Sequence, residues 1–572
     1  MDNPSRRSVN RFLYASILLL FGLNLMLNGP VFRPGFADIN PHDEVKNIES
    51  GWRLLRGDSR GIAWGSLVAV IYALPYLFVQ KSPVWFFLSA GIGRLLIFSL
   101  LFACCLRLSR EFREFFHPLI MLGIFTVARV GTVVLANSSD ALFAVLSGLA
   151  LASVLAYIRT TQVRQLSYAS LFVGLATLTR PDGFVLFSIF AALSFILATR
   201  NKTAVRAAFA VIGPYVGILG VFILVSGLTL REAVYAILER SYQAFEQGQW
   251  VVTQGDWSEA VTETRRIFGS PESNQGSILM AVVEHPEAYL LRLRNLVDLL
   301  PKLTLNAYDN RLAPVLFLLA LGGAIELARA KRIAVLVVMI AWPMHLLVYF
   351  LTFFREGYLL MAFPVVIALA SVGLVTTWVR IVSTRSRAIW SIFLVLLIAY
   401  SAVTSKPTIF ASLSIFLGGL WLIWLARDHL DQPPMVGAVC ALIALSMGIV
   451  LRRSYPFPNF YKLGSAPEER AVLFMGKNLR PGSVVGTVMP LPAVAARMFD
   501  TEIPDLRTAG DLLDWVDREN VSAIYVDGVL RTQKPESWAV IAEAIDNGLV
   551  PAFLGDPGSI QVLLVRSIGS SP

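Results

Sequence analysis

The sequence predicts an α-helical polytopic membrane protein with a small α/β domain at its C-terminal end. Its 572 residues are 56% hydrophobic and only 15% charged, with a mean hydropathy of +0.64, whereas soluble domains carry about 25% charged residues. Apolar runs such as IAVLVVMIAWPMHLLVYFL recur along the chain, and each approaches the roughly 20 residues that cross a bilayer. These two observations exclude a soluble globular chain.

The apolar runs predict about thirteen membrane spans. The first run follows Arg6, Arg7 and Arg11 and ends without a small-residue cleavage site, so we expect an uncleaved anchor rather than a signal peptide. The spans are expected at residues 12–28, 84–106, 116–136, 140–158, 166–180, 183–199, 207–228, 312–329, 333–353, 357–379, 388–404, 408–426 and 434–451.

Basic residues predict the orientation of these spans. Every second short connection is rich in arginine or lysine, whereas those containing NSSD, RPDG, FREG and SKP are nearly bare. Since cytoplasmic loops are the basic ones, we expect the N-terminus in the cytoplasm and the C-terminus outside. The run IAWGSLVAVIYALPYLFVQ, residues 62–80, would invert every later loop if it crossed the membrane. We therefore expect it to lie on or dip into the outer surface; a fourteenth span is the alternative.

The net charge and the cysteines argue against two further features. A net charge of +10 in a soluble protein would indicate nucleic acid, but here membrane topology accounts for the basic loops. Cys104, Cys105 and Cys440 all lie in apolar runs, so we expect no disulfide.

Three segments are expected outside the membrane. They are a first loop at 29–82, a long loop at 229–311 and a tail at 452–572, so that residues 1–451 form the transmembrane domain. In the tail, SVVGTVM, SAIYVD and IQVLLVRS read as strands, and GDLLDWVDREN and ESWAVIAEAIDNG read as helices. The tail is therefore predicted to be a small α/β domain.

The first exported loop contains an amphipathic helix over residues 43–57. Val45, Ile48, Trp52 and Leu55 recur at helical spacing and form its apolar face. We expect the helix to end at Gly57. The opposite, polar face is expected to carry Lys46, Asn47, Glu49, Arg53 and Arg56.

Two adjacent acids begin this helix. Asp43 and Glu44 follow His42, at the end where the helix dipole stabilises negative charge. One interpretation is that Asp43 only caps the helix. The other is that a carboxylate near the mouth of a helix bundle acts as general base toward an acceptor hydroxyl.

The first loop and three later segments resemble the GT-C superfamily of membrane glycosyltransferases. The superfamily has Asp-Glu or His-Pro-Asp-Glu in the first exported loop; this chain has NPHDE, which is nearer the bacterial Asp-Glu form. LANSSDALFAVLSGLALASVLAYIR, GLATLTRPDGFVLF and FREGYLLMAFPVVIALASVGL are similar to later turns of the superfamily. Members include the protein O-mannosyltransferases and the bacterial enzymes that add aminoarabinose to lipid A.

The resemblance implies a reaction and a catalytic pair. GT-C enzymes transfer a sugar from a polyprenyl phosphate carrier with inversion, and the acceptor is a glycolipid, polysaccharide or protein. By similarity Asp43 is the general base, and Glu44 is a positioning group or, with His42, a metal ligand. The resemblance thus leaves open whether the reaction requires a divalent metal ion. The implied location is the bacterial inner membrane, with no nucleic-acid partner.

The resemblance also implies substrate contacts near the spans. Asp140 is a sugar-binding candidate, with a solvated acid at the membrane edge as the alternative. Arg180 either contacts the substrate or forms a structural clasp with Asp182, across the tight turn that Pro181 and Gly183 predict.

Three arginines are candidates for the phosphate, whose charge needs cationic partners when it leaves. Arg355 is the first, because its fork matches phosphate geometry; headgroup snorkelling is its alternative. Tyr358 belongs to the same motif. Arg292 and Arg294 are secondary candidates, and residues two apart on a helix project in different directions, so one of them at most would serve.

A transporter or flippase of a lipid-linked or anionic substrate is the competing class. It would favour polar or broken spans and related halves, whereas these spans carry few ionisable residues and no repeat. The acidic loop and the tail are better explained by a transferase. The sequence names neither the sugar nor the acceptor, and it gives no oligomeric state.

Overall fold

The computed structural model divides the chain into two compact units. One comprises residues 1–30 and 95–457, and the other residues 31–94 and 458–572. Below, these are the bundle unit and the outer unit. The structure describes residues 17–18, 20–22, 24–25, 32, 43–57, 66–80, 85–115, 118–127, 138–200, 203–226, 241–242, 244–246, 248, 257–271, 273–274, 276–307, 313–351, 356–383, 467–545, 550–554 and 560–565.

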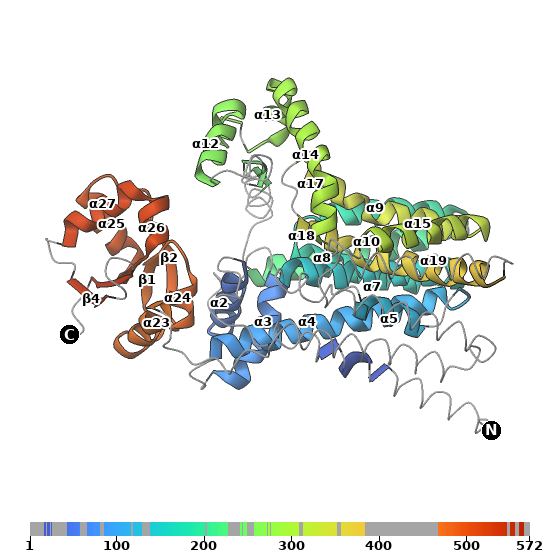
Figure 1. The fold of residues 1–572 in the computed structure, drawn as a ribbon, viewed down its shortest axis with the longest axis horizontal. Coiled ribbons are helices and arrows are strands. Elements are labelled where there is room, and N and C mark those ends of the chain that lie inside the picture. Colours follow the sequence, from blue (N-terminus) through green and yellow to red (C-terminus); the bar gives the residue numbers. More distant parts are fainter. Residues whose placement is uncertain are drawn as a thin grey trace, which may run out of the picture. The chain divides into compact units, whose positions relative to one another are not determined.

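The bundle unit is built from apolar helices that follow the predicted spans (Figure 1). Every predicted span between residues 84 and 228 and between 312 and 379 is helical in whole or in part. Spans 388–404, 408–426 and 434–451 lie outside the described residues. The helices are α4 (Trp85–Ser109, which begins in the outer unit), η4 (Arg110–Phe112), α5 (Pro118–Val127), α7 (Ser138–Thr160), α8 (Arg164–Thr179), α9 (Gly183–Arg200), α10 (Ala204–Ser226), α15 (Ala313–Arg329), α16 (Ile333–Ala341), η5 (Trp342–Leu346), α17 (Leu347–Leu351), α18 (Glu356–Leu359), η6 (Leu360–Ala362) and α19 (Phe363–Ser383).

Among the described residues, three helical stretches are long and apolar enough to cross a membrane: Trp85–Phe112, Ser138–Thr160 and Ala204–Ser226. Shorter apolar helices occur at Leu67–Val79, Gly183–Thr199, Ile333–Tyr349 and Leu360–Thr376. The prediction of a helical membrane protein is confirmed at this level. The count of about thirteen spans and their orientation stay predictions.

Small residues bring the helices of the bundle unit close together. α15 packs on α19, where a side chain on Gly323 or Gly373 would run into the backbone carbonyl of Leu369 or Leu319. Apolar helices associate through such close backbone approach. α7 is buried along nearly its whole length and packs against α8. Polar residues on α7 are therefore placed in the interior of the bundle.

The predicted span 333–353 is not one regular helix. It is α16, the 3₁₀ turn η5 and α17 in succession. Pro343 stands at the start of η5, and proline lacks the N–H that would continue the α-helical hydrogen bonding. The tighter 3₁₀ turn changes the direction of the chain at this point. The next predicted span is interrupted in the same way by η6.

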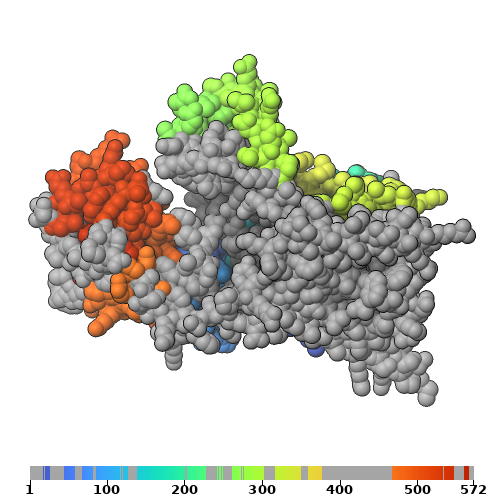
Figure 2. Space-filling model, in the orientation of Figure 1, coloured from blue at the N-terminus to red at the C-terminus, as the bar shows by residue number. Residues whose placement is uncertain are grey.

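Part of the long loop forms a small cluster of its own. Its helices are α12 (Trp257–Phe268), α13 (Ile278–Glu284) and α14 (Pro286–Ala307), which lie at the surface in green in Figure 2. Ser277 caps α13 by accepting a hydrogen bond from the Met280 backbone. Their shared core consists of Tyr242, Phe245, Phe268, Ala281 and Tyr289.

The tail is an α/β domain, as the sequence predicts. Its sheet has the order β2-β1-β3-β5-β4, with β1 parallel to β2 and β3, and β5 antiparallel to β3 and β4. Its elements are α23 (Pro467–Asn478), β1 (Val484–Thr487), α24 (Leu491–Ala495), β2 (Phe499–Glu502), α25 (Ala509–Glu519), β3 (Val521–Val526), α26 (Gly528–Gln533), α27 (Pro535–Ile545), β4 (Val550–Leu554) and β5 (Gln561–Leu564).

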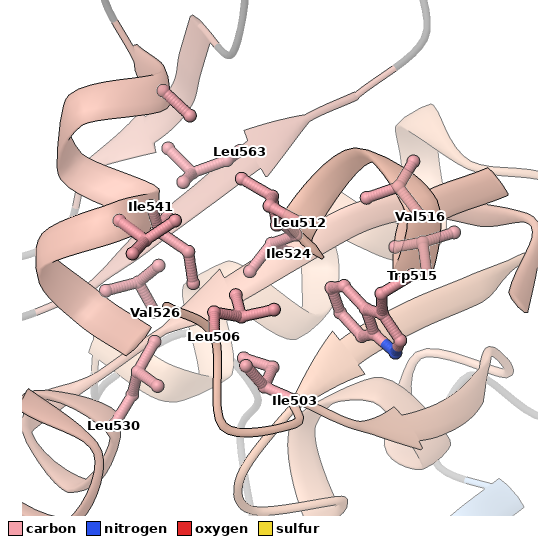
Figure 3. Close-up of a cluster of buried hydrophobic side chains, with 13 residues drawn as sticks. Ile503, Leu506, Leu512, Trp515, Val516, Ile524, Val526, Leu530, Ile541 and Leu563 are labelled. Carbon is pink, nitrogen blue, oxygen red and sulfur yellow. The ribbon is translucent and has the colours of Figure 1, made fainter. Parts of the chain in front are cut away.

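Local sequence explains this domain. Thr508 and Asp511 form a capping box that starts α25, and Asn520 ends it in the left-handed conformation. The apolar residues of α25, α27 and the central strands then meet in one core, in which Trp515, Ile524 and Ile541 are buried (Figure 3). The predicted strands and helices of the tail are present as β1, β3, β5, α25 and α27.

The outer unit also contains the helices of the first loop, α2 (Asp43–Leu55) and α3 (Ser66–Val79). α2 is the predicted amphipathic helix, and Gly57 follows it with a φ of 75°. α3 has 14 residues, about 21 Å of helix, which is shorter than the roughly 30 Å hydrocarbon core of a bilayer. Residues 58–65 lie outside the described residues, so the expectation that 62–80 is not a span stays a prediction.

Two side chains of α2 depart from the predicted faces. Leu55 is 41% exposed although it continues the apolar pattern, and Glu49 is only 3% exposed although we expected it on the polar face. Val45, Ile48 and Trp52 are buried as predicted. The pattern missed Glu49 because a second surface, provided by the tail, covers that side of the helix.

Candidate functional site

Four predicted substrate residues converge in the bundle unit. Asp140 lies in the first turn of α7, Arg180 and Asp182 lie in the turn between α8 and α9, and Tyr358 lies in α18. Tyr349 of α17 completes the group. We call these five residues the Arg180 cluster. The sequence separations are large, so only the packing of α7, α8, α9 and the broken helix brings them together.

Arg180 is the centre of this cluster. Its Nε donates a hydrogen bond to Asp182 Oδ2 at 2.8 Å, and its Nη1 forms an ion pair with Asp140. The Tyr349 hydroxyl donates to the same carboxylate of Asp182. The Arg180 Cζ atom also lies 4.8 Å from the centre of the Tyr358 ring, which stacks on Tyr349 at 4.0 Å.

Burial explains the tight pairing of these charges. The side chain of Asp140 is fully buried, and those of Arg180 and Asp182 are 15% and 17% exposed. An unpaired charge in such a place is costly, so buried carboxylates need cationic or hydrogen-bonding partners. Asp140 is therefore not a solvated acid. Arg180 and Asp182 form the ion pair of the clasp alternative, and contact of Arg180 with the substrate stays the other alternative.

The cluster offers chemistry suited to a sugar. Carboxylate oxygens accept hydrogen bonds from hydroxyl groups, and the side chain of Asp182 is 17% exposed. The stacked rings of Tyr349 and Tyr358 provide an aromatic face beside them. His345 of η5 is also buried, and its Nδ1 lies 2.8 Å from the Trp342 carbonyl oxygen.

The second candidate site lies at the start of α2 in the outer unit. Asp43 is the first residue of this helix; its side chain and His42 lie outside the described residues. Glu44 is 1% exposed, and its two oxygens accept hydrogen bonds from Arg94 at 2.8 and 2.6 Å. The Tyr72 hydroxyl donates to Glu44 Oε1 at 2.8 Å.

This pairing bears on the role of Glu44. A bidentate arginine–carboxylate pair is geometrically specific and strong, and here it joins α2 to α4 while Tyr72 joins α2 to α3. Both oxygens of Glu44 are thereby engaged by protein groups. The geometry favours a positioning group over a metal ligand for this residue.

Arg94 and Tyr349 are site residues that the sequence reasoning missed. Arg94 interrupts the apolar run 84–106, and an ionisable residue within such a run is a signal for function by default. That signal could have found it. Tyr349 carries no comparable signal, because its position depends on the 3₁₀ turn before it.

Three candidates remain, namely Arg355, Arg292 and Arg294. Arg355 lies outside the described residues. Arg292 donates a hydrogen bond to the Phe245 carbonyl at 2.8 Å and lies 4.4 Å over the Phe245 ring, so it holds the core of the long loop. Burial lowers the pKa of Arg292 to about 10. Arg294 is exposed on the same helix.

Metal binding stays open. Within the described part of the chain, no group of three or more His, Cys, Asp or Glu residues is placed to hold a metal ion. The pair that the sequence predicts, His42 with Glu44, is described only at Glu44, where both oxygens already have partners.

Two solved structures resemble this chain over its whole length. ArnT from Cupriavidus metallidurans in the apo state has a TM-score of 0.53 and 13% identity, with 100% of both chains covered. ArnT bound to undecaprenyl phosphate has a TM-score of 0.51 and 14% identity, with 99% of each chain covered. The archaeal oligosaccharyltransferase AglB from Archaeoglobus fulgidus gives a TM-score of 0.47. No protein-family model and no curated protein sequence matches the chain.

At 13–14% identity, this likeness shows that the chain shares its helical fold with ArnT. The sequence resemblance to this superfamily is therefore confirmed at the level of the fold. The particular fold that the chain shares, from end to end, is that of ArnT, the lipid A aminoarabinose transferase.

Proposed function

We propose that this chain is an inverting glycosyltransferase of the bacterial inner membrane. It moves a sugar from a polyprenyl-phosphate carrier to a glycolipid, polysaccharide or protein at the outer face. The observation that carries the proposal is the likeness to ArnT over 100% of both chains. The ArnT structure with undecaprenyl phosphate supports the class of donor.

The chemical step is a single displacement. The acceptor oxygen forms a bond to the anomeric carbon while the bond from that carbon to the phosphate oxygen breaks. The acceptor proton passes to the carboxylate of Asp43, the general base. The electron pair of the broken bond remains on the polyprenyl phosphate, which leaves as a stable anion.

The surroundings of Asp43 support this assignment. It begins α2, where the positive end of the helix dipole favours an ionised carboxylate. Glu44 anchors the same turn through Arg94 and Tyr72. A base whose helix is fixed in this way is pre-organised for attack, and orientation contributes strongly to the rate of such steps.

The Arg180 cluster is the proposed sugar site. Asp140 and Asp182 accept hydrogen bonds from sugar hydroxyls, and the rings of Tyr349 and Tyr358 contact the apolar face of the sugar. Arg355 and Arg294 remain the proposed contacts of the phosphate. Arg292 is the weaker of the secondary pair, because it already binds the Phe245 carbonyl. If a divalent metal binds, His42 is the proposed ligand, and the metal would neutralise charge on the phosphate.

Mass spectrometry of glycolipids and glycoproteins from a deletion strain tests the proposal. We expect one sugar-modified species to disappear, to return with the wild-type chain, and to stay absent with Asp43→Asn. A flippase would predict accumulation of the lipid-linked sugar on the cytoplasmic side, with Asp43→Asn able to restore the product. That result, or an unchanged glycan profile, would overturn the proposed function.

A further inference from the structure

α2 is bound to the tail by charged groups that the proposed reaction does not use. Lys46 Nζ lies 2.5 Å from Asp500 Oδ2 of β2, and the Glu49 carboxyl neighbours that of Asp500. Arg53 Nε and Nη2 donate to Glu49 Oε1 at 2.8 and 2.5 Å. With Phe499, these four residues form what we call the α2–β2 contact.

Aromatic packing reinforces these ion pairs. The Arg53 Cζ atom lies 4.0 Å from the centre of the Phe499 ring, and Trp52 packs on the same ring at 4.7 Å between centroids. A planar guanidinium over an aromatic face is a favourable arrangement. Phe499 and Asp500, the first two residues of β2, therefore both take part in the contact.

The polar core of the contact is shielded from water. The side chains of Asp500 and Glu49 are 3% and 5% exposed. Such a network is stable in one geometry only, because displacement of any member leaves a buried charge without its partner. The contact thus specifies where α2 lies on the tail.

The opposite side of α2 is held equally closely. Gly51 packs against the backbone of α3, where a side chain at this position would lie 2.9 Å from the Ala73 nitrogen. Glu44 binds Arg94 of α4. The helix is therefore fixed between α3 and α4 on one side and β2 on the other. Asp43 precedes Glu49 by six residues, about 9 Å along the axis.

We propose that the tail is part of the catalytic apparatus, because Asp500 fixes α2 and thereby the carboxylate of Asp43. Asp500 is a positioning residue: it acts through Lys46 and Glu49 and does not touch the reacting atoms. This inference rests on the proposed function, since it takes Asp43 as the base. It adds a role for the tail to that function.

The protonation of the contact supports this role. Burial, together with the neighbouring Asp500, raises the pKa of Glu49 to about 8, while the hydrogen bond from Glu49 and the charge of Lys46 lower the pKa of Asp500. The pair therefore shares one proton near neutral pH, with Glu49 as its carrier. The charged groups that face Glu49 are Asp500, Arg53 and Lys46.

Hydrogen exchange of the purified full-length chain tests whether Asp500 fixes α2. In Asp500→Ala, amide exchange over Asp43–Leu55 should rise about tenfold, since the helix loses its contact on one side. Exchange over Ala509–Glu519 should not change, which excludes unfolding of the tail. The matched control is Asp514→Ala, an exposed acid on that helix. Wild-type protection of α2 in Asp500→Ala would overturn the inference.

Turnover in membranes of the complemented deletion strain tests whether Asp500 affects the rate of sugar transfer. Asp500→Ala should lower kcat roughly 10–100-fold, with the KM for the lipid donor changed less than about twofold, since orientation rather than binding is lost. Asp500→Asn keeps an oxygen for Lys46 and should recover part of kcat. Full kcat in Asp500→Ala, beside an inactive Asp43→Asn, would refute this inference alone. Full turnover in Asp43→Asn would refute the proposed function.

Discussion

The Arg180 cluster and the α2–β2 contact each bury two carboxyl groups, and they balance the charge in different ways. In the cluster, one guanidinium lies between Asp140 and Asp182. In the contact, a proton on Glu49 removes the second negative charge, and Lys46 and Arg53 flank the pair. The first arrangement is fixed at any physiological pH, because arginine stays charged. The second responds to pH.

The two groups are also proposed to serve different steps, the Arg180 cluster substrate binding and the α2–β2 contact the chemical step. The cluster groups carboxylates and aromatic rings, and it is the proposed sugar site. The contact presents nothing to a ligand, yet it fixes the helix that begins with Asp43. Damage to the cluster should therefore appear in stability and KM, whereas damage to α2 should appear in kcat.

The largest effect is expected for Asp43→Asn. General bases contribute about 10²–10⁴-fold to a rate, so kcat should fall by that factor, while thermal stability and binding of the lipid carrier stay at the wild-type level. The measurement is the initial rate of product formation in membranes, with carrier binding assayed separately. Loss of carrier binding in this variant would move residue 43 from chemistry to recognition.

How much of the candidate site was predictable depended on the range of the interactions. Arg180 and Asp182 could be predicted as candidates because the proline and glycine beside them mark a tight turn between two short apolar runs. That Asp140 pairs with the same arginine was not predictable, because the pairing depends on how α7 packs against α8. Spacing along the chain carries no such information.

The α2–β2 contact was even harder to predict from the sequence. Periodicity places Glu49 opposite the apolar face of its helix, and β2, with the sequence FDTE, has no strand pattern long enough to detect. Its pairing with β1 comes from the register of the sheet. In contrast, nearly all helices of the bundle unit could be predicted, because an apolar run of sufficient length is a local property.

Arg180→Gln should have the next largest effect. Removal of one partner from a buried ion pair costs about 3–5 kcal/mol, because the carboxylates of Asp140 and Asp182 remain without compensation. We expect a clear drop in Tm of the detergent-solubilised chain. The double variant Asp140→Asn with Arg180→Gln should recover part of the loss. A double variant that shows the plain sum of the two single losses would indicate that the residues do not act as a pair.

Glu44→Gln should have a moderate effect. The amide keeps one oxygen to accept from Arg94 or Tyr72 but loses the charge that matches the guanidinium, and unmatched hydrogen bonds to a charged group cost about 1–3 kcal/mol. Tm should fall by less than in Arg180→Gln, and kcat should fall with it because the first turn of α2 loosens. A variant with wild-type Tm and no activity would instead give Glu44 a direct chemical role.

Glu49→Gln should have the smallest effect on the Tm at neutral pH. It should also change how steeply the Tm depends on pH. Burial raises the pKa of Glu49 from 4.5 to about 8 in the folded chain, so its contribution to stability is full below pH 4.5 and is lost as pH rises past about 8. Asp500, whose pKa is lowered, contributes steadily over this range. The Tm of the wild-type chain should therefore fall as pH rises from about 4.5 to about 8, the interval in which the unfolded chain has lost this proton and the folded chain still holds it, and the glutamine variant should show a flatter curve. Asp514→Asn, an exposed acid, is the control and should follow the wild type. Parallel curves for wild type and Glu49→Gln would mean that the two carboxyl groups do not share a proton, and that the contact holds α2 through Lys46 and Phe499 alone.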